Sequence, residues 1–432
     1  MSKRNQLRDL PDVGYVVADP DTALREAAEL ASHLLIKAGV RFTGSTESMV
    51  PWLVGVRPFA LGVELYERLE RLGEAVFAFL DATQDLYADG NPIVREHLDT
   101  GVPADLRGFD LDRYIQMYRL DVAVSGGMPV LTEVEEIFGN AGKVHAFELA
   151  YGVSATPLYA AFHRLGIANI WLDDGYPMYR SENELVAQRM KDEFGVDVHI
   201  APFSEFRDDG RVGWRFCYVK QLRQYDKHLR SRILAASDRL VNPLFHGYGT
   251  KGLLSLVWDD QLTGHLTARM GKDRVATLRA GVPRSQLLPI NPAPEFIDDL
   301  KTNRRRKVLK VVDSDAAEYT WGSRGIYFGD QSARRWTQAV DAATVGHIPG
   351  RPDLAGTRFV ISDLVDSDKF DVEFLHPMSA QLCVMPDARL RLTPIFARRE
   401  SGGDLLGGHA TFVNTSRKVH LGRHAVCAPF TK

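Results

Sequence analysis

Residues 118–135 read YRLDVAVSGGMPVLTEVE, and this stretch decides the fold prediction. Apolar residues alternate with Arg119 and Asp121 before a glycine turn, and the apolar run after the turn leads into Glu133 and Glu135. A period of two on both sides of a glycine turn is typical of a β-hairpin. The hairpin is therefore expected to bring three carboxylates to one end.

Three carboxylates on neighbouring strands can form a magnesium site. Mg2+ prefers hard oxygen ligands and binds through a few carboxylates together with the phosphates of its substrate. Asp121, Glu133 and Glu135 are therefore candidate metal ligands, and Arg119 is a candidate contact to the phosphates of ATP. Judged from the carboxylates alone, a hairpin with a charged, solvated face is an equally good interpretation.

The composition is that of an ordinary globular chain. It has 432 residues, of which 45% are hydrophobic and 25% are charged, enough for two or three domains with substantial cores. The cysteines are far apart and form no CxxC pair, so neither a disulfide framework nor a zinc site is indicated: Cys217, Cys383 and Cys427. Together with a start that lacks an apolar signal region, this favours a cytoplasmic location.

The charge and hydropathy of the sequence also limit the classes of partner that are expected. No stretch approaches the roughly 20 apolar residues that a membrane span needs, so no membrane partner is expected. The net charge of -3 gives no general basic field, although residues 301–310 contain six Lys and Arg. That run is more typical of a solvated loop or a wall facing ATP phosphates than of a nucleic-acid patch. We therefore expect small-molecule partners.

The first 150 residues are predicted to be a helical N-terminal part followed by the hairpin. In residues 61–80 the apolar positions recur at steps of three and four, with charged residues between them, which predicts an amphipathic helix. A further helical stretch follows the hairpin.

Residues 151–245 have the pattern of a Rossmann-like βαβ unit. A buried strand is predicted at 167–172, and the sequence Ser181-Glu-Asn-Glu184 predicts a capped helix that ends near Gly195 before a second strand at 196–200. Such a strand, helix and strand predict parallel pairing. The unit has no GxGxxG, which disfavours a nicotinamide-binding domain.

Residues 246–432 carry a second group of candidate residues. Lys251 lies at the end of a loop that leads into a predicted apolar helix, and Lys310 lies on a short predicted strand. A glycine-containing turn at 320–329 follows and leads into another predicted strand. Backbone amides of such a turn can close over phosphates, while ammonium groups neutralise them. Taken alone, the motif is also that of a surface hairpin.

The apolar strand predicted at 358–365 is interrupted by the polar residues Ser362 and Asp363, where adenine could meet backbone hydrogen-bonding groups. Taken alone, a buried strand ending is an equally good interpretation. Further along, Arg389 and Arg391 lie on the same face of another predicted strand. Guanidinium groups bind carboxylates and phosphates in bidentate fashion, although two arginines on one face also fit a solvated edge.

The end of the chain is predicted to hold a mobile loop and a closing strand. Residues 400–408 contain four glycines, and an apolar strand is expected at 410–414. For His420 the sequence favours a structural role over a catalytic one.

Taken in order, these motifs resemble the circularly permuted ATP-grasp ligases, of which glutathionylspermidine synthetase is the best-known type. In ordinary ATP-grasp enzymes the metal-binding Asp and Glu-x-Asn follow the lysines and the glycine-rich loop, whereas here the corresponding residues come first. The family pattern Arg-x-Asp followed by Glu-x-Asn matches Arg119 to Asp121 and Glu133 to Glu135. Glu135 replaces the Asn of the family.

The resemblance implies an α/β (α+β) fold: an ATP-grasp fold in circularly permuted order, with residues 151–245 as an inserted pre-ATP-grasp domain and 246–432 as the part that binds ATP. It also implies roles for the residues. Mg2+ would be bound by Asp121, Glu133 and Glu135. ATP would be bound by Lys251, Lys310, Gly322, Ser323, Gly325 and Asp363. Arg119 and Arg391 would support acyl-phosphate formation, with Arg389 competing with Arg391.

In function, the resemblance implies an ATP- and Mg2+-dependent carboxylate-amine ligase that forms an amide and releases ADP and phosphate. Its partners would be a small-molecule acid and a small-molecule amine. Two alternatives remain open: a kinase that releases a stable phosphorylated product, and a nucleotide-binding protein without turnover.

Overall fold

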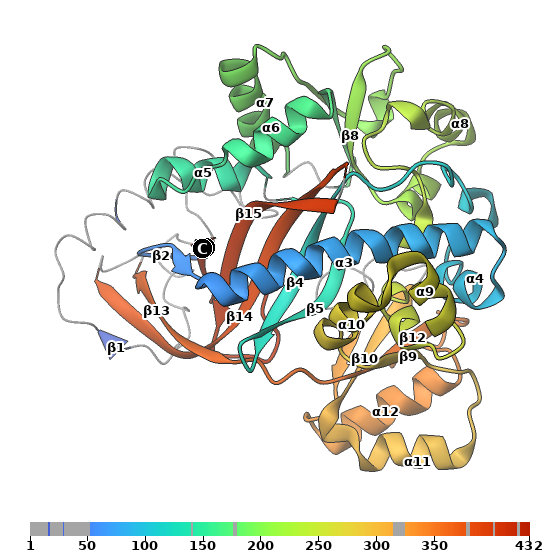
Figure 1. Cartoon of the computed structure of the whole chain (residues 1–432). Helices are drawn as coiled ribbons and strands as arrows, with labels where there is room; N and C mark the ends of the chain where they lie inside the picture. Colours follow the sequence, from blue (N-terminus) through green and yellow to red (C-terminus); the bar gives the residue numbers. More distant parts are fainter. Residues whose placement is uncertain are drawn as a thin grey trace, which may run out of the picture.

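The computed structural model of the chain is shown in Figure 1. The residues that it describes are 16–17, 29, 52–139, 141–175, 179–313, 325–376, 381–400, 402–420 and 424–432. Two predicted phosphate contacts, Gly322 and Ser323, lie outside the described residues.

A mixed sheet of nine strands forms the centre of the structure. Its main path runs β13-β2-β16-β15-β14-β4-β5, with β1 paired to β14 and β3 paired to β16. All pairings are antiparallel except those of β16 with β2 and β3. The strands are β1 (Val16–Val17), β2 (Leu53–Gly55), β3 (Phe59–Ala60), β4 (Met117–Ser125), β5 (Met128–Glu135), β13 (Lys369–Leu375), β14 (Leu382–Arg399), β15 (Gly402–Val413) and β16 (Val426–Thr431). Together with the helices, this sheet confirms a mixed α/β architecture.

The predicted hairpin is strands β4 and β5. Arg119 lies opposite Glu135, and Asp121 lies opposite Glu133. The turn between the strands contains Gly126 and Gly127, with φ angles of 57° and 69°. Since a two-residue hairpin turn of this kind needs positive φ at both positions, glycine is the residue that fits.

Helix α3 (Val63–Ala88) runs across one face of the large sheet, as Figure 1 shows. It is the predicted amphipathic helix, extended by eight residues beyond position 80. Leu69, Leu72, Val76 and Phe79 are buried in the main core, which they share with strands β4, β5 and β14. The other helices that contribute to this core are α4 (Pro92–Leu98), α9 (Thr263–Met270) and α10 (Lys272–Gly281).

A second sheet has three parallel strands in the order β7-β6-β8. The strands are β6 (Ile167–Leu172), β7 (His199–Pro202) and β8 (Val212–Phe216). The helices of this region are α5 (Ala141–Tyr151), α6 (Thr156–Arg164), α7 (Arg180–Phe194) and α8 (Lys227–Ala235). The sequence located β6 and the parallel pairing correctly.

The predicted capping box at the start of α7 is wrong. The N-cap residue is Tyr179, which makes no side-chain cap hydrogen bond, and Ser181 lies inside the helix. The carboxylate of Glu184 instead accepts a hydrogen bond from the Arg180 side chain, one turn earlier in the helix, at 3.2 Å. The predicted end is correct, because Gly195 has the left-handed φ of 68° that a glycine C-cap adopts.

A third sheet has four antiparallel strands in the order β11-β10-β12-β9. Its strands are β9 (Ser285–Leu287), β10 (Lys307–Asp313), β11 (Ile326–Phe328) and β12 (Arg358–Asp363). Helices α11 (Pro294–Thr302) and α12 (Ala333–Thr344) cover it, with Trp336 buried against Leu309 and Phe359 in a separate core. The described short 3-10 helices are η1 (Ala104–Leu106), η3 (Phe203–Glu205), η4 (Val219–Gln224), η5 (Ser237–Arg239), η6 (His246–Gly249), η7 (Leu253–Trp258) and η8 (Arg304–Arg306).

The loop predicted at 400–408 is mostly strand. Residues from Gly402 onward belong to β15, and Gly408 lies opposite Pro394 of β14. A Cβ atom on Gly408 would lie 2.3 Å from the carbonyl oxygen of Thr393. The glycine at this position therefore permits close approach of the strands, which the composition alone does not distinguish from loop mobility.

Among the described residues, no helix combines the length and the apolar character that crossing a bilayer requires.

Candidate functional site

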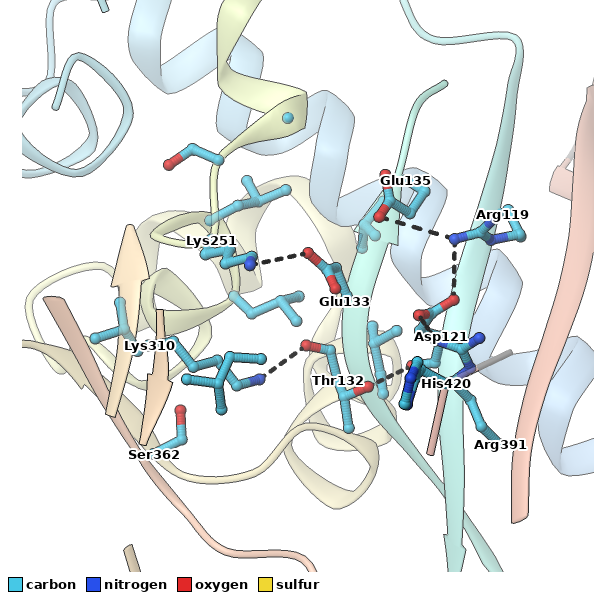
Figure 2. A pocket seen from close by; sticks show the side chains of 18 of the residues that line it. Arg119, Asp121, Thr132, Glu133, Glu135, Lys251, Lys310, Ser362, Arg391 and His420 are labelled. Atoms are coloured by element: carbon cyan, nitrogen blue, oxygen red, sulfur yellow. Dashed lines mark hydrogen bonds and ion pairs between the residues drawn. The ribbon is translucent and has the colours of Figure 1, made fainter. Parts of the chain in front are cut away.

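A cavity of about 560 Å3 lies where the three sheets meet. The hairpin β4–β5 forms one wall, the four-stranded sheet a second, and the region of β8 and η4 a third. Figure 2 shows the side chains of Lys251 and Lys310 approaching the hairpin from the opposite side.

Most of the predicted site residues line this one cavity. They are Arg119, Asp121, Glu133, Glu135, Lys251, Lys310, Asp363 and Arg391. Gly325 is not in the wall itself, although the next residue, Ile326, is. Arg389 does not line the cavity, so of the two competing arginines only Arg391 is placed to act there.

Asp121 is paired with two arginines. Its Oδ2 accepts a hydrogen bond from Arg391 Nη1 at 2.9 Å, and its Oδ1 lies 3.2 Å from Arg119 Nη2. Burial alone would raise the pKa of Asp121, but Arg391 and Arg119 outweigh it and the pKa is lowered. Asp121 is therefore a carboxylate whose charge the protein already neutralises.

Glu133 and Glu135 occupy alternate positions on β5 and both face the cavity. Lys251 Nζ lies 3.7 Å from Glu133 Oε1, while Glu135 accepts a hydrogen bond from the Tyr218 hydroxyl. Burial and then the negative charge of Glu133 raise the pKa of Glu135 to about 8. The two carboxylates are thus crowded enough that added positive charge would stabilise both in the ionised form.

The two lysines reach the hairpin from separate segments. Lys251 lies between η6 and η7, and Lys310 lies on β10, where its Nζ donates a hydrogen bond to the Thr132 carbonyl at 3.2 Å. Burial lowers the pKa of Lys310, although Glu133 opposes this effect. Both lysines therefore contact the hairpin directly (Figure 2).

Asp363 has a different partner. Its Oδ1 accepts a hydrogen bond from Lys307 Nζ at 2.6 Å, across the pairing of β10 with β12. The neighbouring residues Ser362 and Leu364 also line the cavity, so the end of β12 forms part of its wall.

Positive charge predominates in the cavity wall. Eight lysines and arginines face five carboxylates among the described lining residues. The cations are Arg119, Lys220, Arg223, Lys251, Lys310, Arg391, Arg417 and Lys418, and the carboxylates are Asp121, Glu133, Glu135, Asp173 and Asp363. A partly apolar cavity with this excess suits a ligand that carries several negative charges.

Of the three predicted metal ligands, Glu133 and Glu135 are the two whose positions suit a metal ion. Among the described residues, no group of three His, Cys, Asp or Glu side chains is placed to hold a metal ion. Asp121 is paired with two arginines at 2.9 and 3.2 Å, whereas the cations nearest to Glu133 and Glu135 are farther away, Lys251 at 3.7 Å and Arg119 at 3.8 Å. Two carboxylates, completed by phosphate oxygens and water, are a common way of binding Mg2+. The side chains therefore fit a metal that arrives with a polyphosphate.

Several lining residues were not predicted from the sequence. Arg417, Lys418 and His420 come from the segment after β15, and Tyr218, Lys220 and Arg223 come from the segment after β8. For His420 a structural role was expected, yet its ring lies in the cavity wall, where burial and Lys418 lower its pKa. The sequence shows only that Arg417 and Lys418 are adjacent cations, which by itself does not place them at a phosphate site.

Comparison with solved structures identifies a glutathione synthetase-like effector from Globodera pallida in its apo form. The match has a TM-score of 0.54 at 12% identity and covers 97% of this chain and 98% of the other. A proposed gamma-glutamylcysteine synthetase from Methylobacillus flagellatus matches with a TM-score of 0.43 at 11% identity, covering 83% and 88%. No protein-family model and no curated protein matches the sequence. At such identity, the first similarity is evidence about the fold alone.

Proposed function

We propose that this protein is an ATP- and Mg2+-dependent carboxylate-amine ligase that forms an amide bond through an acyl phosphate. The observation that carries the proposal is the single cavity in which Lys251 and Lys310 face the carboxylates of the hairpin, with Arg391 beside Asp121. Cations from separate segments thus converge on one space, as the transfer of a phosphoryl group requires.

The fold supports the same class of reaction. The chain shares its fold, over nearly its whole length, with a protein named for its likeness to glutathione synthetase. A fold hosts more than one function, so the proposal also depends on the side chains of the cavity. We further propose that the chain is an ATP-grasp protein in circularly permuted order, because the carboxylate hairpin precedes both lysines in the sequence.

The proposed first step joins the acid to phosphate. An oxygen of the substrate carboxylate attacks the γ-phosphorus of ATP, the bond to the β,γ-bridging oxygen breaks, and ADP leaves. Lys251 and Lys310 would stabilise the charge on the phosphates, and Arg391 and Arg119 would orient the acyl oxygen. When bound by Glu133 and Glu135, with Asp121 nearby, Mg2+ would neutralise phosphate charge.

In the second step the amine attacks the acyl carbon, phosphate leaves, and the amine loses a proton as the amide forms. The protein acts mainly by positioning and by electrostatic stabilisation, so no side-chain nucleophile is needed. We propose that Gly322, Ser323 and Gly325 cover the phosphates and that Asp363 contacts the ribose or adenine.

One experiment tests the reaction class. The purified protein is incubated with ATP, Mg2+ and cell extract, and ATP-dependent products are identified by mass spectrometry. We expect an amide together with ADP and phosphate, and oxygen-18 placed in the acid should appear in the released phosphate. AMP as the main product would contradict the mechanism, and a stable phosphorylated product without an amide would indicate a kinase. ATP binding without turnover would indicate a non-catalytic protein.

Lys418 gives a prediction about proton uptake. Burial and then the charge of Lys251 lower the pKa of Lys418 to about 8. At pH 8 about half of the Lys418 side chains are then neutral, and nearby phosphates raise the pKa again by favouring the charged form. Nucleotide binding at pH 8 should therefore take up protons, and the uptake should diminish at pH 6.5.

The measurement is calorimetric titration of ADP in two buffers that differ in ionisation enthalpy. Lys418→Arg is the matched control, because arginine stays protonated at this pH. Equal proton uptake by the wild type and by Lys418→Arg would contradict the assignment of Lys418 to the phosphate site.

A further inference from the structure

The three-stranded parallel sheet meets the cavity at an edge that has no role in the proposed phosphoryl transfer. Its order is β7-β6-β8, so the chain goes from β6 to β7 on one side and then returns to β8 on the other. In open parallel sheets, ligands bind at the carboxyl ends of two neighbouring strands where the chain changes direction in this way. Here these are the ends of β6 and β8, where Leu172 lies opposite Phe216. Asp173, which follows β6, and Gln224, which follows β8, both line the cavity.

Asp173 is a buried carboxylate without a countercharge. It is only 2% exposed. It accepts hydrogen bonds from the Gly175 backbone at 2.7 Å and from Gln224 Nε2 at 3.1 Å, and a further one from the Cys217 thiol. No described Lys, Arg or His forms an ion pair with it. Burial raises the pKa of Asp173 and the negative charge of Asp174 adds to this effect, which the hydrogen bonds offset only in part. Because buried carboxylates are ordinarily paired with a cation, Asp173 is placed to receive one from a ligand.

The groups around Asp173 suit a ligand that donates hydrogen bonds. Gln224 donates from its Nε2 to Asp173, which leaves its carbonyl oxygen as an acceptor. Tyr179 and Phe216 also line the cavity, with ring centres 4.5 Å apart. Aromatic faces attract ammonium groups. A carboxylate, a carbonyl oxygen and two rings are together complementary to an organic cation.

The cations of the cavity do not neutralise this carboxylate. Lys220 and Arg223 of η4 line the same cavity, but neither forms an ion pair with Asp173. The charge of Lys220 instead acts on the buried carboxylate of Glu136, whose ionised form it favours. The negative charge of Asp173 is therefore available to a ligand, although the cavity as a whole carries more cations than carboxylates.

We infer that Asp173 and Gln224 bind a non-reacting ammonium group of one of the two substrates. The inference rests on the proposed function and narrows its substrate class: either the acid carries an amino group or the amine carries a second one. An ammonium group donates three hydrogen bonds, which the carboxylate and the Gln224 carbonyl can accept. A neutral group at this position would leave the buried carboxylate without a countercharge, and an anionic group would be repelled by it.

The test has two arms, in which matched pairs of compounds are titrated into the full chain with and without ADP and Mg2+. In the acid arm γ-aminobutyrate is compared with butyrate, and glutamate with glutarate. In the amine arm putrescine is compared with butylamine, and cadaverine with pentylamine. In at least one arm a compound with the additional ammonium group should bind about tenfold or more tightly than its partner, the magnitude of one charge-assisted contact. The arm that responds identifies the substrate that occupies the site.

Asp173→Asn keeps the shape of the side chain and should reduce this ratio to near one. Asp197→Asn is the matched control, because it removes a carboxylate that is 84% exposed and lies outside the cavity, and it should keep the ratio. If circular dichroism shows that Asp173→Asn is unfolded, Gln224→Leu replaces it and should also lower the ratio, since it removes the carbonyl acceptor.

Equal binding within every pair by the wild type, or a preference that persists in the Asp173→Asn protein, would overturn the inference. A separate titration of ADP distinguishes the two proposals. Failure of ADP to bind would count against the proposed function, whereas the titrations without nucleotide would still report on the ammonium site.

Discussion

Replacing Glu133 by Gln is expected to lower the rate of amide formation about a hundredfold at saturating ATP and Mg2+. The substitution keeps the shape of the side chain and removes its charge. Loss of one electrostatic contact at a transition state commonly costs on the order of 3 kcal/mol, which corresponds to this factor. Turnover would be measured as ADP release with the acid and amine found in the extract experiment.

The same variant should bind metal-free ATP at least as tightly as the wild type. Glu133 faces the cavity beside Lys251, so its negative charge opposes phosphate binding when no metal is present. Glu64→Gln, on the exposed side of α3 with 77% of its side chain accessible, is the matched control and should not change the rate. Near-normal turnover of Glu133→Gln would remove Glu133 from the proposed metal site.

Replacing Arg215 by Met is expected to destabilise the protein by about 3–5 kcal/mol, the usual cost of leaving one member of a buried ion pair without its partner. Arg215 and Glu136 form an ion pair in which each side chain is only 1% exposed. Arg215 also donates hydrogen bonds to the carbonyls of Cys217 at 2.6 Å and Pro243 at 3.0 Å. The variant should lower the midpoint of urea unfolding accordingly.

Two comparisons show whether burial causes this effect. The double variant Glu136→Gln/Arg215→Met removes both charges and should recover part of the lost stability. Arg180→Met breaks a largely exposed ion pair with Glu184 in the same part of the chain and should cost less than about 1 kcal/mol. A similar unfolding midpoint for Arg215→Met and Arg180→Met would contradict the role given to the buried pair.

This pair also explains part of what the sequence could not predict. Glu136 directly follows Glu135, and Arg215 lies on β8, so their contact joins the three-stranded sheet to the end of the hairpin. The sequence predicted the parallel strands of that sheet but contained no signal for their position relative to the hairpin. Packing between distant segments, and not the local pattern, places Tyr218 against Glu135.

Local sequence patterns gave wrong predictions where the same composition is compatible with two different structures. The glycines of residues 402–408 have the composition of a loop, but they belong to β15, where Gly408 lies close to the Thr393 carbonyl of β14. The pattern S-x-x-E was interpreted as a cap, but Glu184 pairs with Arg180. In both cases a neighbouring residue decided the structure: Thr393 on the adjacent strand for Gly408, and Arg180 one turn earlier for Glu184.

By itself the sequence determined the elements whose periodicity is local: the hairpin at 117–135, helix α3 and strand β6. It also marked the carboxylates and lysines that the structure brings into one cavity. Only the tertiary structure decided that Lys418, His420 and the η4 cations share that cavity, and that Arg391 lines it while Arg389 does not. The physical reason is that the apolar periodicity of a helix or strand is set within a few residues. A cavity is formed by packing between segments that are distant in the sequence, and the spacing of residues along the chain does not specify that packing.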